Sequence, residues 1–96
     1  MREVYDIKPS ELAKAQDVLG KDDLVSRQSI YTRSAASLGF KEDKIYLIID
    51  GSEESIKRAD QLLKSAAARV KDKTEILRKF DEIENAAAEG FGFLGI

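Results

Sequence analysis

Hydrophobic residues follow two different spacings along the chain, one typical of strands and one typical of helices. Residues 2–7 place strand-forming side chains at alternate positions and stop before Pro9, which predicts a strand. The longest apolar run, residues 45–49, is hydrophobic on both faces and predicts a central strand. Its side chains divide into Ile45, Leu47 and Ile49 on one face and Tyr46 and Ile48 on the other.

Helical spacing marks three further segments. Ser10 is the expected N-cap of a helix that runs to Leu19 and stops at Gly20. Ser52 is the expected cap of a second helix, whose stripe steps by three and four through Ile56, Ala59, Leu63, Ala66 and Val70. Thr74 is the expected cap of a last helix to about Ala88, with the stripe Ile76, Phe80, Ile83 and Ala87.

Residues 23–40 fit either kind of structure. As a helix, the segment gathers apolar residues on one face and ends at Gly39. As strands, residues 29–33 form one β-rich run and residues 35–39 a second. Five short hydroxyl side chains compete with a helical backbone for hydrogen bonds, which favours strands.

These elements predict one domain over residues 1–96, with an apolar, glycine-rich tail at residues 90–96. The fold class is an α/β (α+β) two-layer sandwich, with an antiparallel sheet of about four or five strands and three helices. The expected order is strand, helix, strands, helix, helix.

The composition limits the chemistry that is available. The chain contains no Cys and no His, so it lacks the usual thiolate nucleophile, the usual base near neutral pH and the ligands of structural zinc sites. The acidic pairs Asp22–Asp23 and Glu42–Asp43 leave Mg²⁺ possible but are interpreted as solvated turns. We therefore expect a non-enzymatic protein without cofactor or metal. The absence of a membrane-length apolar run, a signal-peptide pattern and cysteine makes the cytoplasm the expected location.

The run IYTRSAASLGFKEDKIYLIIDGSEESIKRADQLL, together with the apolar ending, resembles a family of small uncharacterised archaeal proteins. The resemblance covers most of the chain and includes no catalytic motif. It implies a two-layer sandwich similar to the TATA-box-binding-protein fold, with an extra C-terminal helix and with strands across residues 23–40. It also implies a positively charged surface for an anionic ligand.

The net charge of −2 hides a banded distribution. Residues 56–73 carry six basic and two acidic side chains, and residues 24–41 carry no acid. If residues 29–33 form a strand, Tyr31 and Arg33 share one face and suit a phosphate or an exposed base. The candidate anion-binding residues are Arg27, Tyr31, Arg33, Lys41, Lys57, Arg58, Lys64, Arg69 and Lys71, with an ordinary solvated surface as the alternative.

The ending GFGFLG, residues 90–95, matches the spacing G-x-G-x-x-G of dinucleotide-binding turns. A nucleotide site of this kind must follow a strand and open a helix, whereas here it follows a predicted helix and only Ile96 comes after it. The match is therefore interpreted as accidental. The tail residues Phe91, Phe93, Leu94 and Ile96 are expected to dock on the domain, with association or disorder as alternatives.

Two functions follow from the sequence. The first is a binding module whose basic surface contacts an anionic ligand, with nucleic acid as the leading candidate. The second is a protein-interaction or assembly module that uses the apolar tail and the outer face of the sheet. The oligomeric state is left open.

Overall fold

The structure is a computed structural model that describes residues 1–64 and 66–94, with side chains described up to residue 85. Its elements, in chain order, are the strands, α-helices and short 3₁₀ helices (η) that follow: β1 (Arg2–Ile7), η1 (Pro9–Glu11), α1 (Leu12–Gly20), η2 (Val25–Arg27), β2 (Ser29–Ser34), η3 (Ala36–Leu38), β3 (Ile45–Asp50), α2 (Glu53–Leu63), β4 (Ala67–Arg69) and α3 (Thr74–Leu94).

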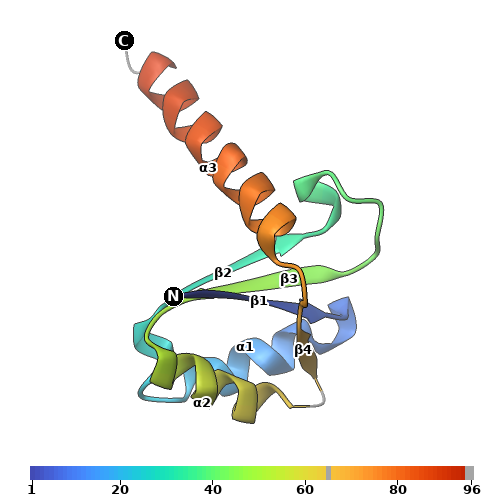
Figure 1. Ribbon diagram of the computed structural model, residues 1–96, viewed down its shortest axis with the longest axis vertical. Helices are drawn as coiled ribbons and strands as arrows, with labels where there is room; N and C mark the ends of the chain where they lie inside the picture. Colours follow the sequence, from blue (N-terminus) through green and yellow to red (C-terminus); the bar gives the residue numbers. More distant parts are fainter. Residues whose placement is uncertain (65, 95–96) are drawn as a thin grey trace.

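The four strands form one antiparallel sheet in the order β2-β3-β1-β4. Helices α1 and α2 cover one face, and the first half of α3 crosses the other before the helix runs away from the sheet (Figure 1). The predicted α+β fold class with an antiparallel sheet and three α-helices is confirmed. The order of elements differs at one place, because β4 lies between the last two helices.

The main hydrophobic core lies between the sheet and the pair α1 and α2. Alternate residues of β1 and β3 point into this layer, as the sequence predicted for the odd-numbered positions of β3. Its buried members are Tyr5, Ile7, Ala15, Leu19, Val25, Leu47, Ile49, Ile56, Ala59 and Leu63.

A second, smaller core lies on the opposite face, beneath η3 and the start of α3. It is formed by the other set of strand residues together with the first two members of the α3 stripe: Val4, Ala35, Leu38, Tyr46, Ile48, Ile76 and Phe80. Because β3 contributes side chains to both cores, its predicted central position is confirmed.

The helix predicted through Val70 is wrong beyond Leu63. The backbone of Lys64 takes φ 30° and ψ −100°, the Ala66 N–H donates to the carbonyl of Leu63 at 2.7 Å, and the chain then pairs with β1. Val70 packs in the second core, on the other side of the sheet from Leu63. Pairing with the otherwise open edge of β1 therefore overrides the helical spacing of Ala66 and Val70.

Residues 23–40 are resolved in favour of a strand, but only in part. The strand predicted at residues 29–33 is confirmed as β2. The second predicted strand is wrong, because residues 36–38 form η3, which ends at Gly39 with φ 91°. This tight turn buries both Ala35 and Leu38 in the second core, which an alternating strand of this register cannot do.

The predicted helix ends are correct at some positions and wrong at others. Ser52 caps α2, because its side chain accepts the N–H of Ser55 at 3.1 Å. Ser10 is not an N-cap, since it lies inside η1 and α1 begins at Leu12. Helix α3 begins at Thr74 and continues to Leu94, past the predicted end at Ala88. Most of the G-x-G-x-x-G match is therefore inside a helix rather than at a strand-to-helix turn.

Gly51, directly after β3, is required by a close approach rather than by its backbone angles. A Cβ at this position would lie 2.5 Å from Gln28 Oε1 and 2.6 Å from Ser55 Oγ. Ser55 is fully buried, and its hydroxyl donates to the Ser52 carbonyl. Its side chain can therefore move away from a Cβ at position 51 only if that hydrogen bond breaks.

We expect Gly51→Ala to lower the free energy of unfolding by about 1–3 kcal/mol, because the clash must be relieved by moving packed groups. A Cβ at Gly20, the last residue of α1, meets nothing within 4 Å. Gly20→Ala should therefore be neutral or stabilising by up to about 1 kcal/mol. Urea unfolding of the two variants measures the difference, and equal midpoints would contradict the packing described here.

Candidate functional site

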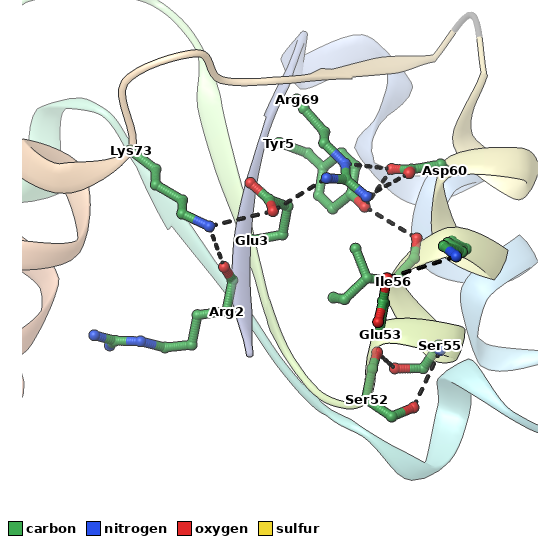
Figure 2. A network of polar contacts seen from close by, with 11 residues as sticks. Arg2, Glu3, Tyr5, Ser52, Glu53, Ser55, Ile56, Asp60, Arg69 and Lys73 are labelled. Carbon is green, nitrogen blue, oxygen red and sulfur yellow. Dashed lines mark hydrogen bonds and ion pairs between the residues drawn. The ribbon is translucent and has the colours of Figure 1, made fainter.

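A network of charged groups joins β1, α2, β4 and the segment before α3 (Figure 2). Arg69 on β4 binds both carboxylate oxygens of Asp60 on α2, at 2.9 and 2.6 Å, and its Nη1 donates to Glu3 Oε2 at 3.2 Å. Lys73 donates to the same Glu3 oxygen at 3.2 Å and to the Arg2 carbonyl at 2.6 Å. Glu3 is only 7% exposed, so two cations compensate one nearly buried carboxylate.

Tyr5 extends this network into the main core. Its hydroxyl donates to Asp60 Oδ1 at 2.7 Å, and burial together with this bond raises the pKa of Tyr5 far above its ordinary value. The hydrogen bonds from Arg69 and Tyr5 lower the pKa of Asp60. The donors Tyr5, Arg69 and Lys73 already bond acceptors of the protein itself. The network therefore stabilises the packing of β4 against α2 and β1.

Tyr31 and Arg33 lie on one face of β2, as predicted, but helix α3 packs against them and leaves Tyr31 38% exposed. The Arg33 guanidinium lies 5.9 Å from the Tyr31 ring centroid and 5.2 Å from that of Phe80. It also forms an ion pair with Glu84 at 2.6 Å. The pair therefore contributes to binding α3 to the sheet and offers less of a phosphate site than the sequence suggested.

Arg33 has a further contact along the outer edge of β2. Its Nη1 donates to the Thr32 carbonyl at 2.8 Å, and Ser37 Oγ donates to the Ser34 carbonyl at 2.7 Å. Since the Ala35 N–H bonds to Lys44 of the neighbouring segment, the carbonyls of Ile30, Thr32 and Ser34 point outward. Side chains of the same domain thus occupy two of the acceptors on this edge.

The other basic candidates are spread over several elements. Arg58 pairs with Asp22 at 2.7 Å, and Lys57 with Glu53 at 3.6 Å. Asp22 Oδ1 also accepts the N–H groups of Leu24 and Val25, which makes this acidic residue a turn cap. Within residues 1–64 and 66–85, four candidates have no carboxylate within ion-pair distance: Arg27, Lys41, Lys64 and Lys71.

The nine candidates do not form one surface. Arg27 precedes β2 at one end of the sheet, and Lys41 precedes β3 at the other. The basic band at residues 56–73, predicted to lie on one helix, is divided among α2, its C-terminal turn, β4 and the following loop.

A shallow recess of about 280 Å³ lies where β1 ends and β4 begins. We call it the β1–β4 recess, and it is lined by Asp6, Lys8, Glu11, Lys64 and Ala66–Ala68. Lys64 reaches it from a backbone conformation with positive φ, which costs a residue with a Cβ about 1–3 kcal/mol. Lys64 was among the candidates predicted from the sequence and Lys8 was not, because the pairing of β4 with β1 is what brings these two residues to one place.

The distal half of α3 leaves the sheet (Figure 1). Ile76 and Phe80 are buried, whereas Ile83, the next member of the same stripe, is 40% exposed. The side chains of Phe91, Phe93 and Leu94, and all of Ile96, lie outside the described part of the structure, so the predicted docking of these residues stays a prediction.

No arrangement of three or more acidic side chains suited to a metal ion occurs in the described part of the chain. Among its described helices, none combines the length and the apolar character needed to cross a membrane. Comparison with known proteins gives no match to a family model, to a curated protein or to a solved structure.

Proposed function

We propose that this protein is a non-enzymatic interaction module that associates through the distal half of α3. The observation that carries the proposal is the continuation of an apolar stripe beyond the sheet that buries its first members. Helix α3 has 21 residues, which corresponds to a length of about 31 Å. This length contributes to the elongated outline of the molecule, 44 × 29 × 23 Å.

The stripe supports the proposal by its composition. Positions 76, 80 and 83 continue at helical spacing to Ala87, Phe91 and Leu94. Residues 86–96 contain one charged residue, Glu89, among alanine, glycine and large apolar residues. A helix of this composition is stabilised when another apolar surface covers it, because apolar side chains are then removed from water.

The partner proposed is a second copy of the same chain. Two identical helices related by a two-fold axis bury the same stripe on both, so no other protein is needed to complete the surface. In such a pair, the stripe positions beyond the sheet, from Ile83 onward, are covered by the same positions of the second copy.

Sedimentation velocity over about a hundredfold range of protein concentration tests this proposal. The native protein should pass from monomer to dimer, and Phe91→Lys should weaken association by about a hundredfold, because a lysine would be buried without a partner. Asn85→Lys is the matched control, since position 85 falls on the opposite side of the helix and its side chain is exposed. A native protein that remains monomeric throughout, or a Phe91→Lys protein that associates as the native one does, would overturn the proposal.

Binding of nucleic acid remains a prediction, supported by the four candidate cations that have no carboxylate within ion-pair distance among residues 1–64 and 66–85. Because these cations lie at different places in the fold, they would contact phosphates at separate points, with weak and strongly salt-dependent binding. Titration with short DNA and RNA at two salt concentrations should shift the amides of Arg27 and Lys41 most, and the shifts should fade as salt increases.

A further inference from the structure

The β1–β4 recess contains an unbalanced pair of lysines. The carboxylate of Asp6 is paired with Lys44 at 2.8 Å, and Lys44 also bonds Glu42. In the described part of the chain, no carboxylate lies within ion-pair distance of Lys8 or Lys64. The two lysines share the lining with two acidic residues, Asp6, which is already paired with Lys44, and Glu11.

The backbone at Lys64 gives a second reason to associate this recess with a ligand. A turn with φ 30° between α2 and β4 favours glycine, yet this chain has a lysine there. Strain of this kind concentrates at ligand-binding and catalytic positions, where the side chain is needed at that place. The strained residue here is one that lines the recess.

The alanines of the recess leave space for a ligand. Ala66–Ala68 project only methyl groups, so the volume is not filled by the protein's own side chains. The Val70 N–H bonds to Val4 and the register pairs Ala68 with Asp6, so the N–H of Ala67 points to the outer edge of β4. This amide is directed away from β1, whose end supplies Asp6 and Lys8, so the lysine side chains are the candidate donors to an anion in the recess.

We propose that the β1–β4 recess binds small phosphate-bearing molecules. Lys8 and Lys64 are point charges suited to a phosphate dianion. The carboxylates of Glu11 and Asp6 suit hydroxyl groups on the organic part, because carboxylates only accept hydrogen bonds at neutral pH. At about 280 Å³ the recess lies at the lower end of ligand-site volumes, which selects small compounds.

The site is independent of the proposed association through α3, because it lies on different elements and rests on different observations. Amide NMR titration of the full chain tests it, with inorganic phosphate and glycerol 3-phosphate as probes and chloride at matched ionic strength as the blank. Both probes should shift the amides of Lys64 and Ala66–Ala68, with the ester binding more tightly.

Lys64→Gln should weaken binding of both probes by about tenfold, the size expected for loss of one charge-assisted contact. Lys14→Gln removes the same charge from an exposed position on α1 and should bind both probes as the native protein does. Lys64→Gly separates ligand binding from strain. It should weaken phosphate binding as Lys64→Gln does but raise the melting temperature by about 5 °C, because glycine adopts the turn freely.

Three results would overturn the proposal. They are the absence of phosphate-specific shifts at the recess, equal affinities of the native and Lys64→Gln proteins, and an equal loss of affinity in Lys14→Gln.

Discussion

Replacing Phe80 with alanine is expected to destabilise the folded protein by about 3–5 kcal/mol, a large part of the stability of a domain this size. Phe80 is 6% exposed, and its ring lies 5.2 Å from that of Tyr31 and 5.2 Å from the Arg33 guanidinium. Its loss would leave a cavity at the centre of the smaller core and would release α3 from the sheet. Chemical unfolding at a low, fixed protein concentration measures the change.

Two further variants identify the physical cause of this loss. Phe80→Leu keeps most of the apolar volume and should cost about 1.5 kcal/mol or less, through the lost aromatic and cation–π contacts. Ile83→Ala removes a side chain that is 40% exposed and should cost less than about 1 kcal/mol. Equal effects of Phe80→Ala and Ile83→Ala would mean that α3 is not bound to the sheet through Phe80.

Arg69→Met should destabilise the protein by about 2 kcal/mol and loosen β4. The change removes one of the two cations that pair with the nearly buried Glu3 among the described residues, leaving Lys73, and it removes the bidentate partner of Asp60. Since β4 is three residues long and two of them are alanine, few apolar contacts compensate. Hydrogen exchange should show faster exchange at Ala68 and Val70 than in the native protein.

The same variant changes the dependence of stability on pH. Arg69 lowers the pKa of Asp60 in the folded state, so the native protein gains stability above the unfolded pKa of about 4 and loses it as the pH falls below that value. Without Arg69 that acid-sensitive part should shrink. Arg78→Met is the control, because the carboxylates that pair with Arg78 in the described part of the chain, Glu75 and Glu82, are exposed and the pairs should contribute little to the free energy of unfolding. If Arg69→Met lost as much free energy of unfolding on acidification as the native protein does, the role given to Asp60 would be contradicted.

The elements that the sequence predicted correctly are those whose patterns depend on one strong local property. Strand β1 ends before Pro9, β3 is apolar on both faces, and Ser52 caps α2 with its own side chain. In each case neighbouring residues contain the whole reason for the structure, so no distant contact was needed to predict it.

Strand β4 and the turn η3 depend on contacts that no local pattern contains. Ala66 and Val70 continue the helical spacing of α2, yet residues 67–69 form a strand because they pair with the open edge of β1. Likewise, the turn η3 allows Ala35 and Leu38 to be buried together in the second core beside α3, a contact that is distant in sequence and that strand alternation does not predict. The β1–β4 recess depends on the same pairing, which is why Lys8 could not be found from the sequence.

The sequence predicted correctly that Tyr31 and Arg33 share a face of β2, but it did not predict that helix α3 packs against them. Alternation placed the two side chains together on one face, and the structure agrees. The sequence held no sign that Glu84, more than fifty positions later, returns to pair with Arg33.

The occupied acceptors along β2 have a consequence for the size of any assembly. With the Thr32 and Ser34 carbonyls already bonded, another chain that tried to extend the sheet at this side would have to displace the domain's own donors. Growth by adding strands at the β2 edge is thereby opposed, whereas helices that meet about a two-fold axis use up their surface after one pairing. Association through α3 should therefore stop at a small, closed particle.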